Sequence, residues 1–179
     1  DLTEEGDGAT EVDVINSSGW TEELALYSKT ARGGGDKGSY VLSLSWSKGR
    51  GAKLKLDFDP MDCTGKSLQF DIADTDTQGV KRGDRDILDA EITLIDAWGQ
   101  TATLILSDYA LIYPPLPVNL GKLQYVLKKP EYKILYSTVS IPVADFSEEL
   151  DMHNIIGVTI RFMGRSDGSV NLDNIGFGK

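Results

Sequence analysis

Residues 89–106 read DAEITLIDAWGQTATLIL, and this stretch decides the fold class. Apolar side chains alternate with mostly polar ones on both sides of a short segment that contains Gly99. Alternation of period two is typical of a strand with one buried face, and a glycine-containing segment between two such runs predicts a turn. We therefore expect two paired antiparallel strands joined over residues 96–101.

The same alternation recurs along the chain, in runs where apolar residues hold every second position: Tyr40 to Trp46, Leu54 to Phe58, Leu68 to Ile72, Ile134 to Tyr136 and Ile156 to Phe162. No segment has a convincing helical period. Residues 74–86 are expected as a loop, and residues 146–152 as one short helical turn. About eight to eleven strands at this spacing predict an all-β fold, a two-sheet antiparallel β-sandwich of the jelly-roll type.

Composition excludes several classes of partner. The 179 residues include 18 basic and 28 acidic side chains, a net charge of −10, and no basic patch, so nucleic acid is not expected. No apolar run approaches the roughly 20 residues of a membrane helix, so no membrane partner is expected. The single Cys63 excludes an internal disulfide. We expect residues 1–10 to be a linker or flexible end and residues 11–179 to form a single domain.

One acid near the end of the chain stands among apolar residues. Asp173 lies within the stretch Ser169 to Phe177, between Leu172 and Ile175. A buried carboxylate must be paired, hydrogen-bonded or bound to a metal, and calcium is one such partner. The alternative is an acid that accepts hydrogen bonds from its own neighbours in a turn.

Three short motifs carry a resemblance that spans nearly the whole chain: Val12 to Ile15 followed by Gly19 and Trp20, Asp36 to Leu42, and Val170 to Phe177. Together they resemble the framework of the calcium-containing β-jelly-roll carbohydrate-binding modules of polysaccharide-degrading enzymes. The resemblance implies a structural calcium ion. Carried over by position, its ligands are Glu11 or Asp13, the backbone carbonyl of Asp36 or Lys37, and the side chain of Asp173.

Polar residues on the strands suggest a binding face. If the apolar set of each strand is the core, the opposite positions collect Gln69, Asp71, Glu91, Thr93, Thr101, Thr103 and Arg161. We expect them to form one polar sheet face, on which carboxylate, amide and guanidinium groups suit vicinal sugar hydroxyls. The alternative is a solvated face whose opposite charges pair across strands and contribute little.

Aromatic residues decide between these alternatives, because a sugar also needs an apolar ring to stack on. Trp98 lies at the expected hairpin tip and is the leading candidate, with Tyr109 and Tyr113 beside the polar face. For all three, the alternative is packing under a long loop. Trp20 and Trp46 are expected in the core, and Tyr125, Tyr132 and Tyr136 are expected to be structural.

The expected function is that of a non-catalytic carbohydrate-binding module of a secreted bacterial polysaccharide-degrading enzyme. It would bind a polysaccharide or oligosaccharide, with a β-glucan or hemicellulose as target, and its partner would be the catalytic domain of the same parent chain. One alternative is a ligand-free spacer domain. Another is a jelly-roll glycosidase or lyase that uses paired carboxylates such as Asp71 and Glu91, since a glycosidase needs two of them roughly 5–10 Å apart.

Overall fold

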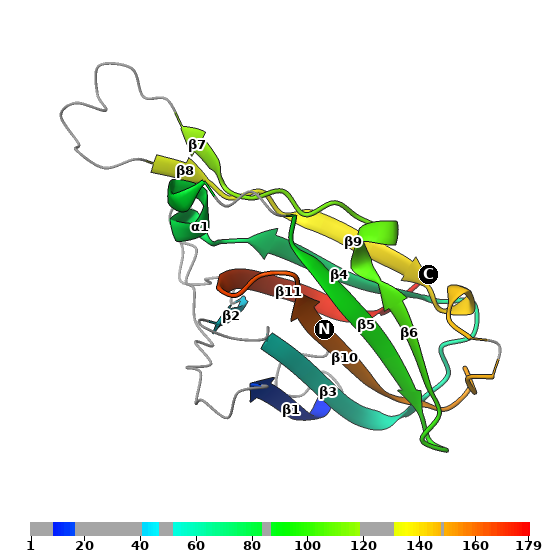
Figure 1. Ribbon diagram of the computed structural model, residues 1–179. Helices are drawn as coiled ribbons and strands as arrows, with labels where there is room; N and C mark the ends of the chain where they lie inside the picture. The colour runs from blue at the N-terminus through cyan, green and yellow to red at the C-terminus, as the bar shows by residue number, and fades with distance from the viewer. Residues whose placement is uncertain (1–8, 17–40, 47–51, 84–86, 119–130, 148) are drawn as a thin grey trace, which may run out of the picture.

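The structure is a computed structural model that describes residues 9–16, 41–46, 52–83, 87–118, 131–147 and 149–179. Within these residues two antiparallel β-sheets pack against each other (Figure 1). The apolar positions of the alternating runs lie between them. The predicted two-sheet β-sandwich is therefore confirmed. None of the helices in the described part of the chain is long and apolar enough to cross a membrane.

The first sheet, called sheet A, has five strands in the order β1-β3-β10-β5-β6. They are β1 (Ala9–Asn16), β3 (Ala52–Met61), β10 (Ile155–Met163), β5 (Asp89–Asp96) and β6 (Thr101–Ile105). Strands β5 and β6 form the expected hairpin, with Thr93 opposite Thr103. The local sequence pattern was sufficient to predict this pairing.

The second sheet, called sheet B, has four strands in the order β2-β11-β4-β9. They are β2 (Leu42–Trp46), β11 (Gly168–Gly178), β4 (Ser67–Asp74) and β9 (Ser137–Pro142). Strand β4 therefore lies in a different sheet from β5, although β5 is the next long strand in the sequence. This division decides which polar residues share a surface.

The remaining elements are short: α1 (Thr77–Arg82), η1 (Leu106–Asp108), η2 (Val143–Asp145), and the strands β7 (Leu116–Val118) and β8 (Glu131–Lys133), which pair as a small separate sheet. The expectation of a loop over residues 74–86 is wrong for residues 77–82, which form α1. Six residues are too few to show a helical period in the sequence. Asp76 caps this helix by accepting from the backbone N–H of Gly79 at 2.8 Å. The described residues of 146–152, where a short helical turn is expected, form no helix, although the backbone N–H of Leu150 donates to the carbonyl of Ser147 at 3.1 Å; the short helix η2 precedes them.

The core joins the two sheets through aliphatic and aromatic side chains. Trp46 of β2 is 4% exposed, as expected for a core residue, and stacks on Phe162 of β10 with ring centroids 5.5 Å apart. Gly168 lies opposite Trp46 in the β2–β11 ladder. A Cβ atom there would lie 2.2 Å from Cζ2 of Trp46, so the close approach of ring and backbone requires glycine.

Candidate functional site

The outer surface of sheet B is built from small and uncharged polar residues with two carboxylates. Because successive side chains of a strand point to opposite sides, the residues that alternate with the core positions face outward. We define the polar face of sheet B as the following outward positions: Ser43, Ser45, Gln69, Asp71, Ala73, Thr138, Ser140, Ser169, Asn171 and Asp173. No lysine or arginine occurs among these described positions.

An exposed tyrosine lies across one end of this face. Tyr136 is 45% exposed, and its hydroxyl accepts a hydrogen bond from Nδ2 of Asn171 at 3.0 Å. Oδ1 of Asn171 in turn accepts from the hydroxyl of Ser43 at 2.7 Å. Asn171 pairs with Ala73, while Ser137, the residue after Tyr136, pairs with Ile72. The tyrosine side chain therefore passes over the small Ala73 to reach β11, and this contact fixes its position.

A second network holds the middle of the face. Oδ1 of Asp71 accepts from the hydroxyl of Thr138 at 2.6 Å, and Oδ2 accepts from Nδ2 of Asn174 at 2.8 Å. Asn174 has a φ of 54°, and the register of the β4–β11 pair shifts between Asp173 and Gly176. Asparagine tolerates this left-handed conformation better than most residues. The irregularity thus brings an amide side chain onto the carboxylate of the neighbouring strand.

Gln69 lies over the end of β11. A Cβ atom at Gly178 would come within 2.8 Å of Oε1 of Gln69, so the glycine leaves room for the amide. The face therefore presents pre-arranged hydroxyl, amide and carboxylate groups beside one aromatic ring. Such a surface can offer hydrogen bonds to the hydroxyls of a flat ligand and an apolar ring to its C–H groups.

The outer surface of sheet A is different in kind. Nη1 of Arg161 lies 3.0 Å from Oε2 of Glu91, Lys55 pairs with Asp57, and the hydroxyls of Thr93 and Thr103 lie 2.8 Å apart. These cross-strand and same-strand contacts match the solvated-face alternative. Among the described residues, none of the exposed large aromatic side chains belongs to a strand of this sheet.

The expectation that all seven polar residues share one face is wrong. Gln69 and Asp71 belong to β4 in sheet B, whereas Glu91 and Arg161 belong to sheet A, and the core lies between the two outer surfaces. The chain moves from sheet B to sheet A through α1, which joins β4 to β5. The predicted pairing of the Asp71 and Glu91 carboxylates on neighbouring strands fails for the same reason.

The three aromatic candidates differ in their surroundings. Trp98 is 76% exposed in the turn between β5 and β6, as predicted, and Tyr113 is 56% exposed after the isolated bridge between Leu88 and Ile112. Tyr109 is half-buried, and its hydroxyl donates to Oδ2 of Asp145 at 3.1 Å. Burial and this neighbouring carboxylate raise the pKa of Tyr109. Tyr109 thus joins the segment after β6 to the segment after β9.

Tyr136, which the sequence predicts to be structural, lies at the surface, with its hydroxyl bonded to Asn171. A usable signal lies in β9, where Val139 and Ile141 are buried while Thr138 and Ser140 are exposed. Extending this phase backwards assigns residue 136 to the outer side. Sequence reasoning also missed Asn171, because in its strand attention went to the apolar residues and to Asp173.

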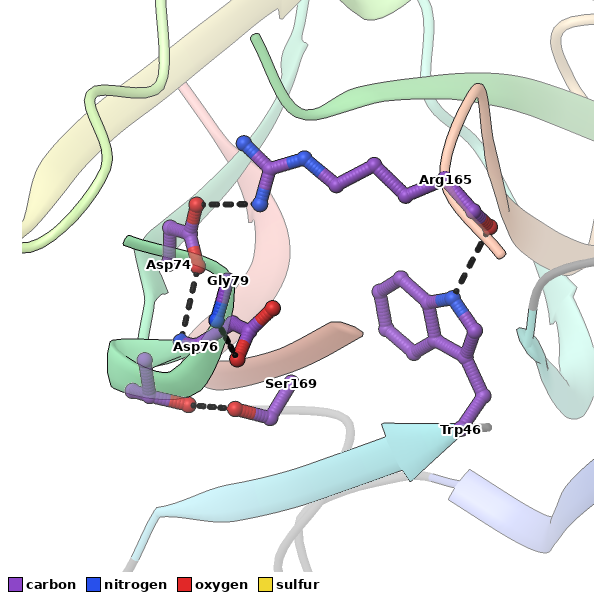
Figure 2. Close-up of polar contacts among 7 residues, drawn as sticks. Trp46, Asp74, Asp76, Gly79, Arg165 and Ser169 are labelled. Atoms are coloured by element: carbon purple, nitrogen blue, oxygen red, sulfur yellow. Dashed lines mark hydrogen bonds and ion pairs between the residues drawn. The ribbon is translucent and has the colours of Figure 1, made fainter. Parts of the chain in front are cut away.

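A buried polar cluster lies at the end of sheet B next to α1 (Figure 2). Nη1 of Arg165 donates to Oδ2 of Asp74 at 2.6 Å, and the backbone carbonyl of Arg165 accepts from Nε1 of Trp46 at 3.3 Å. The hydroxyls of Thr75 and Ser169 lie 2.7 Å apart. These contacts tie the end of β4 to the turn between β10 and β11. The charged pair is buried, so it holds the fold rather than presenting a surface.

The expected calcium ligands lie in separate parts of the fold. The backbone of Glu11 and Asp13 belongs to β1 in sheet A, whereas Asp173 belongs to β11 in sheet B, where its Oδ1 accepts from the backbone N–H of Asn174 at 2.9 Å. Asp36 and Lys37 fall outside the described residues. Within the described part of the chain, no three Asp, Glu, His or Cys side chains gather in a group able to hold a metal. Calcium stays a prediction.

Comparison with known proteins identifies similar solved structures. No protein-family model matches the chain, and no curated protein matches it. The chain is similar to a family 30 carbohydrate-binding module, with a TM-score of 0.53 and 13% sequence identity over 93% of this chain and 76% of that one. It is also similar to a family 11 carbohydrate-binding module from Clostridium thermocellum in complex with a β-1,3-1,4-mixed-linked tetrasaccharide, with a TM-score of 0.51 and 13% identity over 96% and 91% of the two chains.

Larger enzymes contain the same fold. An agarase structure matches with a TM-score of 0.55 and 12% identity, covering 100% of this chain but only 24% of the agarase chain. The chain thus spans about a quarter of that enzyme. At these identities the similarity shows a shared β-sandwich fold, and function has to be argued from the site.

Proposed function

We propose that this chain is a non-catalytic carbohydrate-binding module whose ligand lies on the polar face of sheet B. The single observation that carries the proposal is the ring of Tyr136, held over β4 by Asn171 on a face without basic side chains among its described positions. A fixed, half-exposed tyrosine beside hydroxyl and amide groups suits the alternating C–H and hydroxyl surfaces of a pyranose. The similarity of the fold to carbohydrate-binding modules supports this reading.

The proposed ligand is a plant-type polysaccharide, a β-glucan or hemicellulose. A neutral glycan suits a surface that carries Asp71 and Asp173, because an acidic polymer would meet like charge there. We further propose that the domain is secreted and acts beside a catalytic domain of the same parent chain, so that binding raises the concentration of the enzyme at its substrate. The agarase structure, in which a similar fold makes up a minor part of the chain, supports this arrangement.

The alternative of a ligand-free spacer has no specific observation in its favour. A spacer needs a stable core and a soluble surface, but it does not need an aromatic ring positioned by an amide on a neighbouring strand. The polar contacts on the outer surface of sheet A illustrate what a merely solvated face contains. The two faces of one molecule can therefore serve as test and control.

Affinity electrophoresis against soluble mixed-linkage β-glucan, xyloglucan, xylan and galactomannan tests the proposal. We expect at least one polymer to retard the protein, Tyr136→Ala to remove most of the retardation, and Tyr136→Phe to keep an intermediate part because the ring remains. Thr103→Ala, on the outer surface of sheet A, is the matched control and should migrate as the unaltered protein does. Equal retardation of Tyr136→Ala and the unaltered protein would place the ligand elsewhere, and no retardation by any polymer would favour the spacer.

A further inference from the structure

The turn between β5 and β6 presents an aromatic ring far from the polar face of sheet B. Trp98 is 76% exposed, the largest fraction among the exposed large apolar side chains of the described residues. Figure 1 shows the tip of the β5–β6 hairpin at the end of the sandwich opposite α1 and the β7–β8 pair. A single exposed tryptophan is ordinary on a protein surface. What distinguishes Trp98 is how firmly its surroundings hold it.

A buried carboxylate fixes the backbone of the turn. Asp96 is fully buried, and its Oδ1 accepts from the backbone N–H groups of Trp98 and Gln100, both at 2.9 Å. Its Oδ2 accepts from the backbone N–H of Asp151 at 3.0 Å. The carboxylate therefore ties the hairpin tip to the loop that precedes β10. Gly99, with a φ of 80°, supplies the left-handed residue that this tight turn requires.

A second carboxylate fixes the ring itself. Oδ2 of Asp151 lies 3.3 Å from Nε1 of Trp98 and accepts from Nδ2 of Asn154 at 2.9 Å. The backbone N–H of Ala97 also donates to the carbonyl of Asn154 at 2.9 Å. The indole is thus held at its backbone and at its ring nitrogen while most of its surface stays open. A ring fixed in this way loses little conformational entropy when a ligand stacks on it.

The loop around residue 151 is itself anchored on its other side. The backbone N–H of Cys63 donates to the carbonyl of Met152 at 2.8 Å, and Nδ1 of His153 lies 3.3 Å from Oδ1 of Asp62. Three connections between strands therefore meet at this end of the sandwich. The Asp151 carboxylate and the Asn154 amide bonded to it lie beside the exposed indole, and both kinds of group can bind hydroxyls.

We propose that Trp98 forms a second saccharide contact, separate from the polar face of sheet B and formed together with Asp151 and Asn154. The inference rests on the proposed function, because it assigns a second contact to the same class of ligand. Tyr136 precedes Ser137, which pairs with Ile72 near the end of β4 that leads to α1. Trp98 instead follows the end of β5 that lies away from α1. An eight-residue strand spans about 25 Å, so one sugar residue cannot touch both rings.

The surroundings of Trp98 favour a sugar over a protein partner. Among the described residues, none of the other exposed large apolar side chains belongs to the three connections that meet around Trp98, which are residues 62–66, 96–101 and 146–154. Protein interfaces centre on clustered apolar and aromatic anchors. One rigid ring among polar groups instead matches a single pyranose, whose hydroxyls need partners around the stacked face.

Two separate contacts would let one module hold two segments of polysaccharide. Linking two weak contacts raises the overall affinity for a polymer, since the second contact forms at the effective concentration set by the first. Loss of either ring should then weaken binding to a polymer, whereas loss of both should remove it.

Tryptophan fluorescence titrated with soluble mixed-linkage β-glucan, xyloglucan, xylan and galactomannan reports on the ring directly. We expect the polymer that the protein binds to shift emission to shorter wavelengths in the unaltered protein and in Tyr136→Ala. Trp98→Phe should lose this shift, which separates Trp98 from the buried Trp46. Affinity electrophoresis should show about a five- to tenfold weaker association for Trp98→Ala, and melting temperatures should confirm that both Trp98 variants fold.

The outcomes separate the two proposals. If the unaltered protein binds a polymer while Trp98→Ala binds it equally well and the emission does not shift, the second contact is wrong and the proposed function stands. If Trp98→Ala loses all binding while Tyr136→Ala loses none, the only site is at the hairpin tip, and the two-contact proposal is overturned. If no polymer binds the unaltered protein, both proposals fail together.

Discussion

Arg165 and Asp74 form a salt bridge in the protein interior, with 2.6 Å between Nη1 and Oδ2 and side chains that are 4% and 0% exposed. Removing one member of such a pair leaves a buried charge without its main partner, which costs about 3–5 kcal/mol. We therefore expect Arg165→Ala to lower the melting temperature by about 10 °C or more, measured by calorimetry.

Two further variants test whether the loss of stability comes from the charge that is left buried. Arg161→Ala removes a half-exposed arginine that pairs with Glu91 at 3.0 Å, and such a surface pair is worth about 0–1 kcal/mol. The double variant Arg165→Met with Asp74→Asn removes both buried charges and should be more stable than Arg165→Ala alone. Equal losses for Arg165→Ala and Arg161→Ala would contradict a special role for the buried pair.

Acid should destabilise the end of the sandwich that carries Trp98. Burial raises the pKa of Asp96, but the backbone N–H groups of Asp151, Gln100 and Trp98 outweigh it, so the pKa lies below the ordinary value of 3.8. The pKa of Asp151 is lowered chiefly by the side chain of Asn154 and the backbone of His153, and that of Asp62 by Thr64. A carboxylate with a lowered folded-state pKa contributes stability above its unfolded pKa and loses it as the pH falls.

Melting curves between about pH 2 and 6 measure this effect. The melting temperature should fall as the pH drops below about 4, since the three carboxylates then take up protons more readily in the unfolded chain. Asp151→Asn should make the fall of the melting temperature shallower, because it removes one of the carboxylates whose pKa is lowered. A steeper fall of the melting temperature with decreasing pH in Asp151→Asn would contradict the prediction that the ionised Asp151 stabilises the folded state.

The alternation of apolar residues predicted which side of each strand is buried, but it did not predict which strands are neighbours. Leu68, Phe70 and Ile92 all lie in the core as expected. The connection through α1 carries the chain from one sheet to the other, and its six residues show no helical period. Local spacing alone therefore predicts that the polar residues of β4 and β5 share one face, although the core separates them.

The candidate site depended on register as well as on alternation. Tyr136 precedes β9, and only the pairing of Ser137 with Ile72 shows that the tyrosine continues a row that contains Ala73 and Asn171. Such long-range pairing is not visible in local spacing. The exposure of Trp98, in contrast, follows from the local turn alone, whereas the contact of its ring nitrogen with Asp151 depends on a loop that is far away in the sequence.

The variant Asp173→Asn should change the melting temperature in opposite directions, depending on whether a structural calcium ion is bound at Asp173. Asp173 pairs with Asp71 across the β4–β11 ladder, and like charges directly opposite each other destabilise a sheet. Without a metal, Asp173→Asn should slightly raise the melting temperature. With a bound calcium ion it should lower it, because an ion at 100 times its Kd stabilises the folded state by about 2.7 kcal/mol.

Chelation followed by calorimetry and elemental analysis supplies the second measurement. Calcium binding predicts a lower melting temperature after chelation, its recovery on adding Ca²⁺, and no further effect of chelator on Asp173→Asn. A protein that contains no metal, melts unchanged after chelation and is stabilised by Asp173→Asn would show that Asp173 only accepts a hydrogen bond from Asn174.

The last prediction concerns catalysis. Glu91 is paired with Arg161 on sheet A, and both oxygens of Asp71 accept hydrogen bonds from protein donors on sheet B. Asp71 and Asp173 pair across the β4–β11 ladder and are the two carboxylates among the described positions of the polar face, and a glycosidase needs two such groups. The proposed non-catalytic function predicts no reducing ends and no unsaturated product from any polysaccharide that the protein binds. Release of product that disappears in Asp173→Asn, but persists in Glu91→Gln, would show that this pair is catalytic.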